Sequence, residues 1–237
     1  ARDGPRFAPV DRRLAAVPAG AERKVVVTGM PVRAEVAALA GTDYPAPEPD
    51  GPVRVAVFGG SQGARGFSEV VPAALDHLPQ PLRRRIVITQ QCREEDLEQV
   101  RAAYAEQGVS ADLGTFFKDM PKRLAEAHLV IARAGASTVA ELTALGRPAI
   151  LVPYPHAVDD HQTANAQALD ETGGGWLMHQ EAFTPQALAG RLEDLLALPA
   201  TLPKAAACAR AVGRPAAARH LADMVEELIT STKETGR

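Results

Sequence analysis

The hydrophobic and polar positions become regular from Val53 onward, where short apolar runs alternate with amphipathic segments. The runs, such as VRVAVF and LVIA, are continuous rather than alternating, which is typical of parallel strands covered by helices on both faces. We therefore expect strands at residues 53–58, 85–89, 112–117, 129–132, 149–152 and 176–178. The segments between and after them predict helices at residues 64–78, 94–107, 119–127, 137–145, 160–172, 185–197 and 214–231.

Strands that alternate with helices at this spacing predict an α/β fold, a Rossmann-like parallel sheet with helices on both faces. Ligands of such sheets bind outside the carboxyl ends of the strands. The candidate ligand loops are therefore those after residues 58, 89, 117, 132 and 152. The earlier part of the chain is less regular: residues 24–28 predict an isolated strand or a linker, and residues 41–52 a loop rich in proline and glycine.

Composition narrows the classes of function. Hydrophobic residues make up 46% of the 237 residues, enough for a buried core, and no apolar run approaches the roughly 18–20 residues that span a bilayer. The sequence does not begin with a signal peptide, so we expect a cytosolic location. Cys92 and Cys208 are the only cysteines, which excludes a disulfide scaffold and a cysteine-based zinc site. A net charge of −3 and 4% aromatic residues argue against nucleic acid as a partner.

A glycine-rich segment, Gly59–Arg65 (GGSQGAR), follows the first regular strand and leads into a helix. Glycines let the backbone approach a ligand, and the free N–H groups at a helix start suit a phosphate. The segment is not a Walker loop, and it lacks the GxGxxG pattern of a dinucleotide dehydrogenase. A tight turn in which Ser61 caps the helix explains the same residues, so both interpretations stay open.

The second loop, residues 133–141 (RAGASTVAE), combines small residues with one carboxylate. Small residues bring the backbone near the crevice, and Glu141 could accept hydrogen bonds from two ribose hydroxyls. Thr138 and Glu141 also fit a capping box, in which the glutamate folds back onto its own helix start. Local residues favour the cap, and the two roles are not exclusive.

The third loop, residues 153–165, is dense in side chains that could bind sugar hydroxyls. A metal site is the weaker interpretation, because the five-residue spacing of the histidines does not put both on one helical face and no further ligand is evident. Its candidate ligands are His156, Asp159, Asp160 and His161. Further upstream, Arg33 follows a turn and could clamp a phosphate, although a solvated surface arginine is the commoner case.

Taken together and in this order, GGSQGAR, RAGASTVAE and PYPHAVDDHQTANA resemble the C-terminal half of the MurG family. These are UDP-N-acetylglucosamine (UDP-GlcNAc) transferases of peptidoglycan synthesis with the GT-B fold. Residues 27–33 (VTGMPVR) are similar to the linker motif between the two domains of that family, and the resemblance covers residues 24–237. It implies inverting transfer of GlcNAc to a lipid-linked acceptor, the conversion of lipid I to lipid II, with no metal or other cofactor.

The resemblance also implies roles for matching residues. Gly60, Ser61 and Gln62 face the diphosphate, and Arg33 is the linker arginine near the nucleotide. Glu141 binds the ribose hydroxyls. The remaining matches are Phe116 and Phe117, whose backbone pairs with uracil; Ala136, Ser137 and Thr138, beside the diphosphate and ribose; and His161 and Gln162, near the GlcNAc hydroxyls.

The chain departs from the family pattern in two ways. Met30 stands where the linker motif usually has asparagine, which removes a polar contact. The N-terminal domain of the family has no counterpart, so we expect residues 1–30 to be a remnant of that domain and the linker, and residues 31–237 to be the UDP-GlcNAc donor-binding domain. The general base, the lipid acceptor site and the membrane-facing patch would belong to the other half, with the whole enzyme peripheral on the cytoplasmic side of the membrane.

Two other functions remain as alternatives. The chain could be the donor-binding subunit of a two-chain GlcNAc transferase, although the irregular residues 1–23 favour a truncated protein instead. A GT-B UDP-GlcNAc epimerase is the third interpretation, since Asp159 and Asp160 could supply carboxylates around the sugar.

Overall fold

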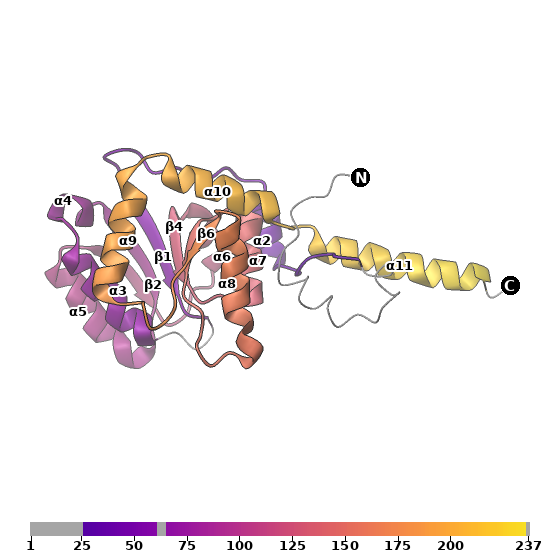
Figure 1. Ribbon diagram of the computed structural model, residues 1–237, viewed down its shortest axis with the longest axis horizontal. Coiled ribbons are helices and arrows are strands. Elements are labelled where there is room, and N and C mark those ends of the chain that lie inside the picture. Colours follow the sequence, from indigo (N-terminus) through magenta and orange to yellow (C-terminus); the bar gives the residue numbers. More distant parts are fainter. Residues whose placement is uncertain (1–25, 61–64, 236–237) are drawn as a thin grey trace.

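A computed structural model describes residues 26–60 and 65–235, which form one six-stranded parallel sheet with helices on both faces (Figure 1). The strand order is β3-β2-β1-β4-β5-β6, and every neighbouring pair is parallel. The predicted fold class is therefore confirmed. The strands are β1 (Val53–Phe58), β2 (Ile86–Gln91), β3 (Ser110–Gly114), β4 (Leu129–Ala132), β5 (Ala149–Leu151) and β6 (Gly175–Leu177).

The helices divide between the two faces of the sheet. One face packs on α3 (Arg65–His77), α5 (Leu97–Glu106) and α9 (Pro185–Ala197). The other packs on a larger group: α2 (Ala34–Leu39), α6 (Met120–Glu126), α7 (Ala136–Leu145), α8 (His161–Glu171) and α10 (Thr201–Val212). The described residues also form α4 (Gln80–Arg83) and α11 (Ala217–Thr235), and α11 extends away from the sheet (Figure 1).

The central strand β1 shows why its residues form a doubly covered strand. Val55 and Val57 point into the core on the α3 side, whereas Ala56 and Phe58 point into the core on the α7 side. Successive residues of a strand face opposite sides, so a strand between two helix layers needs apolar residues on both faces, and in β1 only Arg54, near its start, is exposed. This accounts for the continuous apolar runs of the sequence.

Most predicted elements appear with small shifts, and three lie exactly where the pattern places them. These are the strands at 53–58 and 129–132 and the helix at 185–197, whose N-cap Thr184 accepts a hydrogen bond from the backbone N–H of Ala187 at 3.2 Å. The predicted helix 94–107 is a 3-10 turn, Glu94–Asp96, followed by α5.

Some predictions are wrong. Residues 115–117 lie beyond β3, which begins two residues earlier than expected. Residues 26–28 form no strand, which leaves the linker interpretation for the described part of 24–28. The final helix begins at Ala217 rather than 214, and the sequence pattern missed α2, α4 and α10. All three begin without a side-chain cap, and α2 and α4 are also short, so they lack the signals on which helix prediction depends.

Within residues 26–60 and 65–235 no single helix combines the length and apolar composition of a membrane span. One pair, Pro185–Ala197 with Thr201–Glu227, passes by length and composition when the two helices are taken together, and they meet at 94°.

Candidate functional site

The candidate site lies where the strand order reverses direction. β1 has β2 on one side and β4 on the other, so the loops after β1 and β4 leave the sheet side by side. The loop after β5 is next to them. In open α/β sheets this switch point is where nucleotides bind. The structure thus brings the three predicted ligand loops together at one edge.

The glycine-rich loop is described only in part. Gly60 has φ of +87°, and a side chain added there would meet no heavy atom within 4 Å, so its backbone faces open space. Glycine alone adopts such a φ readily. Ser61 and Gln62, the other two residues expected to face the diphosphate, lie outside the described residues. Gly60 therefore fits the expected close approach of a ligand to the backbone.

The linker arginine and the loop glutamate form a two-pronged ion pair. Arg33 Nε donates to Glu141 Oε1 at 2.6 Å, and Arg33 Nη2 donates to Oε2 at 2.7 Å. Glu141 is 8% exposed, and the hydrogen bond to it raises the pKa of Arg33. Arg33 directly precedes α2, which packs against α6 and α7. The linker motif is therefore held beside α7, the helix that carries Glu141.

The capping-box interpretation of Thr138 and Glu141 is wrong. The helix α7 begins two residues before Thr138, with Gly135 as its N-cap, so neither side chain is at a cap position. The Glu141 carboxylate is turned to Arg33 instead. No side chain caps the start of α7, and the exposed Ala136 and Ser137 are its first residues. The first N–H groups of the helix, with the positive end of its dipole, are thus available at the switch point.

The start of α8 binds the backbone of the neighbouring loop. Gln162 Oε1 accepts from the N–H of Ala134 at 3.2 Å and from the N–H of Tyr154 at 3.0 Å, and Asn165 Nδ2 donates to the Ala134 carbonyl at 2.9 Å. Sequence reasoning missed these contacts, which fix the loops after β4 and β5 relative to each other. A glutamine amide also has a nitrogen donor, the group with which Gln162 would reach a sugar hydroxyl.

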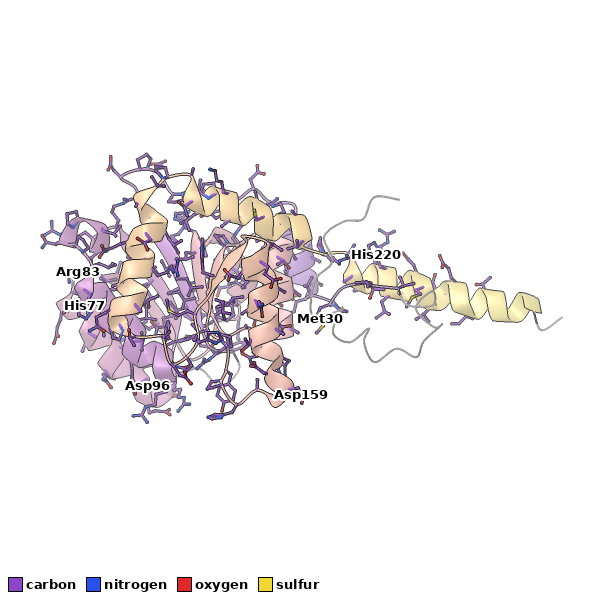
Figure 2. The ribbon with its side chains drawn as sticks, viewed as in Figure 1. Met30, His77, Arg83, Asp96, Asp159 and His220 are labelled. Carbon is purple, nitrogen blue, oxygen red and sulfur yellow. The ribbon has the colours of Figure 1, made fainter. Side chains whose placement is uncertain are left out.

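The acidic pair before α8 has an unusual backbone. Asp159 and Asp160 have φ of 52° and 50°, in the left-handed region, and Asp160 is the N-cap of α8. Asp159 lies near the end of α8 in Figure 2. The backbone of residues other than glycine rarely adopts a positive φ, so the backbone here is strained. His161 is the first residue of α8 and is exposed. Among the described residues no three His, Cys, Asp or Glu side chains are grouped to hold a metal ion.

The predicted uracil segment follows β3, which is separated from β4 by β2 and β1, and it leaves the sheet at the same carboxyl edge. Phe116 is 72% exposed. Phe117 is half-buried beneath the Arg123 guanidinium, which lies 4.2 Å from the centre of its ring. An exposed aromatic residue beside an anchored one is a surface that can contact a base, and the role of the backbone stays a prediction.

One polar residue of the edge was not among the predicted ligands. Arg133 follows β4 directly, and its Nη1 donates to the carbonyls of Val152 at 3.1 Å and Pro153 at 3.0 Å. Its guanidinium also faces the rings of Phe67, at 5.0 Å, and Tyr154, at 5.7 Å. Burial lowers the pKa of Arg133. The signal in the sequence was its position, an arginine at the end of a buried strand before a run of small residues.

A pocket of about 110 Å³ lies between the linker and α7, and Met30 and Ala136 are among its lining residues. Met30 lies on the side of the domain from which α11 projects (Figure 2). The lining is mostly apolar, so the methionine that replaces the family asparagine faces a nonpolar pocket beside α7.

The fold and the site together define the class: a Rossmann-type domain with three loops gathered at the carboxyl edge, where domains of this type bind nucleotides. The sequence model of the glycosyltransferase family 28 C-terminal domain matches residues 54–224, and the chain belongs to this family. The chain is similar to the UDP-N-acetylglucosamine–N-acetylmuramyl-(pentapeptide) pyrophosphoryl-undecaprenol N-acetylglucosamine transferase of Paramagnetospirillum magneticum, with 62% identity over 87% of this chain and 56% of that protein. It spans about half the length of the curated relatives it matches.

Solved structures agree with this assignment. The crystal structure of Acinetobacter baumannii MurG has 35% identity and a TM-score of 0.70, over 78% of this chain and 55% of that one. The resemblance to the C-terminal half of MurG, which is one lobe of the GT-B fold, is thus confirmed. A putative UDP-N-acetylglucosamine 2-epimerase from Listeria monocytogenes superposes with a TM-score of 0.60 over 93% of this chain and 57% of that one. Its identity is 16%, so that likeness concerns the fold alone.

Proposed function

We propose that this chain is the UDP-GlcNAc donor-binding half of the transferase that adds GlcNAc to lipid I and so forms lipid II. The observation that carries the proposal is the Arg33–Glu141 pair, which joins two expected nucleotide ligands at the switch point of the sheet. The family membership and the 62% identical relative support it. The ion pair, the family and the relative all point to binding of a sugar nucleotide at this edge.

The proposed division of the chain places residues 1–30 in the N-terminal domain remnant and linker, and residues 31–237 in the donor-binding domain. Its support is that the first helix after Arg33 packs against α6 and α7, with Val36 fully buried in the core. A segment that buries a valine in the core of a lobe belongs to that lobe.

The proposed ligand contacts follow the three loops. Glu141 accepts from the ribose hydroxyls with the lone pairs that Arg33 leaves free, since each carboxylate oxygen can accept more than one hydrogen bond. Ala136, Ser137 and Thr138, in the first turn of α7, present N–H groups to the diphosphate, together with Gly60, Ser61 and Gln62. Phe116 and Phe117 bound the uracil, and His161 and Gln162 bound the GlcNAc.

The proposed chemistry is an inverting displacement in which an acceptor hydroxyl attacks the anomeric carbon and UDP leaves. The leaving diphosphate gains negative charge, which fixed N–H donors and a helix N-terminus stabilise without rearranging. The general base that takes the acceptor proton would come from the other half of the enzyme. The donor half therefore binds UDP-GlcNAc and prepares the departure of UDP.

The lipid-linked acceptor and the cytoplasmic face of the membrane are proposed partners of the other half. The helix α11 supports such a second half, because it projects from the domain with Leu221, Val225 and Ile229 exposed at intervals of one turn (Figure 1). An apolar stripe of this kind is normally covered by another element. Its proposed cover is the N-terminal domain, as in GT-B folds generally.

Calorimetric titration of this chain with UDP and with GDP tests the proposal. We expect UDP to bind in the micromolar to millimolar range, GDP to bind more weakly, and no GlcNAc transfer to a lipid-linked acceptor by this chain alone. Absence of UDP binding at millimolar concentration would overturn the donor-binding assignment. Robust transfer by this chain alone would instead overturn the placement of the general base in the other half.

A further inference from the structure

Arg133 lies at the candidate edge, where it connects the loop after β5 to the start of α3. It is the first residue after β4, its Nη1 donates to two carbonyls at the end of β5, and its guanidinium faces Phe67 in the first turn of α3. That turn follows directly on the glycine-rich loop. A single guanidinium thus lies between the first turn of α3 and the loop expected to hold the sugar.

The charge of Arg133 has no carboxylate partner within residues 26–60 and 65–235. Its contacts there are two carbonyl dipoles and two aromatic faces, whereas Arg33 nearby is neutralised by Glu141. Half-burying a cation without an anion costs free energy, which carbonyls and π faces offset only in part. Burial lowers its pKa accordingly, although an arginine stays protonated.

We propose that Arg133 is a positioning residue for the diphosphate of the donor: a fixed cation that attracts the two phosphates and stabilises the UDP leaving group. The inference rests on the proposed function, which supplies a nucleoside diphosphate at this edge. The two carbonyl bonds hold the guanidinium in place, so its field at the edge does not depend on a flexible side chain. The π faces exclude water and keep the charge poorly screened.

The competing explanation is purely structural, with Arg133 as a clamp that fixes the loop after β5. The two roles differ in what they do to ligands of different charge. A clamp affects uridine and UDP alike, because both occupy the same loops. A cation affects UDP and leaves uridine, which has no phosphate, nearly unchanged.

Calorimetric titration with uridine and with UDP, on the full chain, separates the two roles. Arg133→Gln removes the charge, and Arg133→Met does so while keeping a stem that packs between the two rings. At the effective dielectric of a protein surface, a unit charge within about 10 Å of a diphosphate changes its affinity by roughly tenfold. We expect the dissociation constant for UDP to rise by roughly tenfold in both variants, and that for uridine to change by less than about twofold.

Arg85→Gln is the matched control. Arg85 also lacks a carboxylate partner in the described part of the chain and is held by carbonyls, those of Gly51 at 3.0 Å and Glu48 at 3.1 Å. It precedes β2, at the opposite edge of the sheet, and its substitution makes the same change in net charge. We expect it to leave both affinities unchanged. Thermal unfolding of each variant verifies that the chain is folded.

Equal weakening of uridine and UDP in the Arg133 variants would overturn the proposal in favour of the clamp, and unchanged UDP affinity would overturn it outright. Arg133→Lys, which keeps the charge but not the fork or the stacking, should retain most of the preference for UDP over uridine. Failure of the parent chain to bind either ligand is a different result, since it counts against the proposed function and not specifically against Arg133.

Discussion

The amino and carboxyl edges of the sheet each contain an arginine that is held by backbone carbonyls. The two arginines differ in their burial and in the number of carbonyls that they bind. At the amino edge Arg147 is 0% exposed, and carbonyls surround its guanidinium. They belong to Asp43, Leu124, Ala125, Leu145 and Gly146. At the carboxyl edge Arg133 is half-exposed and donates to two carbonyls through one nitrogen.

The cluster around Arg147 stabilises the fold, whereas the groups around Arg133 can still accept a ligand. Arg147 joins the ends of α6 and α7 to the loop after α2, where Tyr44 packs 5.6 Å from its guanidinium, and its bonds satisfy carbonyls at helix ends. The carbonyls around Arg147 are therefore satisfied by the protein itself. At the carboxyl edge Arg133, Glu141 and the start of α7 retain hydrogen-bonding capacity, which is what a ligand requires.

The largest expected effect is the loss of stability on substituting Arg147. Arg147→Leu leaves several buried carbonyls without donors, so we expect the free energy of unfolding to fall by about 3–5 kcal/mol. Chemical denaturation measures this. The comparison predicts a much smaller loss, about 1 kcal/mol, for Arg133→Met at the other edge. Equal losses would mean that the two arginines play the same structural role.

The second effect is on binding rather than stability. Glu141→Gln weakens the acceptor for the ribose hydroxyls and breaks the ion pair with Arg33, so we expect uridine and UDP to bind about 10- to 100-fold more weakly. Stability should change by less than about 1 kcal/mol, because the Arg33 side chain is 48% exposed. Titration calorimetry measures the first and thermal unfolding the second.

Glu126→Gln is the control for this substitution. Its carboxylate lies 3.8 Å from Lys122 on the exposed side of α6, and we expect it to change neither affinity nor stability measurably. If Glu141→Gln bound UDP as well as the parent chain, the proposed ribose contact would be wrong.

The third effect is a pH dependence that arises at the amino edge. Burial, with the charges of Arg54 and Arg147, lowers the pKa of His128 from 6.5 to about 4. Between these values the unfolded histidine binds a proton that the folded one does not, so stability falls as the pH falls from about 6.5 to about 4. We expect a loss of about 3 kcal/mol from this group, measured by denaturation at several pH values.

His128→Asn shows how much of the pH dependence belongs to this residue. Asparagine can still accept the hydrogen bond that His128 Nδ1 accepts from the Arg54 N–H at 3.1 Å, and it does not titrate. We expect a flatter pH profile in this window. A profile as steep as that of the parent chain would assign the effect to other groups.

The smallest effect concerns one hydroxyl. The Tyr44 hydroxyl donates to the His128 carbonyl at 2.8 Å, and Tyr44→Phe should lower the free energy of unfolding by about 1 kcal/mol. Tyr154→Phe at the carboxyl edge, where Tyr154 is 46% exposed, should cost nothing measurable. Thermal unfolding of the two variants side by side tests this, and a larger loss at Tyr154 would reverse the comparison.

Sequence patterns predicted the fold well where a single local signal determined the element. The strands at 53–58 and 129–132 are continuous apolar runs, and Thr184 followed by Pro185 marks the start of α9. They failed at α10, which has no side-chain cap, and at β3, an edge strand in which no residue is fully buried. Such elements depend on their neighbours for stability rather than on their own pattern.

The candidate site divides in the same way. The sequence by itself indicated candidate residues: the glycine-rich loop and Glu141 stood out locally, and the resemblance to the MurG family supplied their expected roles and that of Gln162. Only the tertiary structure decided what these side chains contact. Glu141 meets Arg33 across 108 residues, which no local pattern encodes, and the capping box that the local pattern favoured does not form.

Arg133 and Arg147 make the same point. Each reads in the sequence as an ordinary arginine beside small residues, 14 positions apart. The strand order brings the ends of β4 and β5 together at one edge and the ends of α6 and α7 together at the other. This arrangement buries Arg147 among carbonyls and leaves Arg133 without a carboxylate partner among the described residues. The sequence determined where charge is present, and the packing of the sheet and helices decided where that charge can act on a ligand.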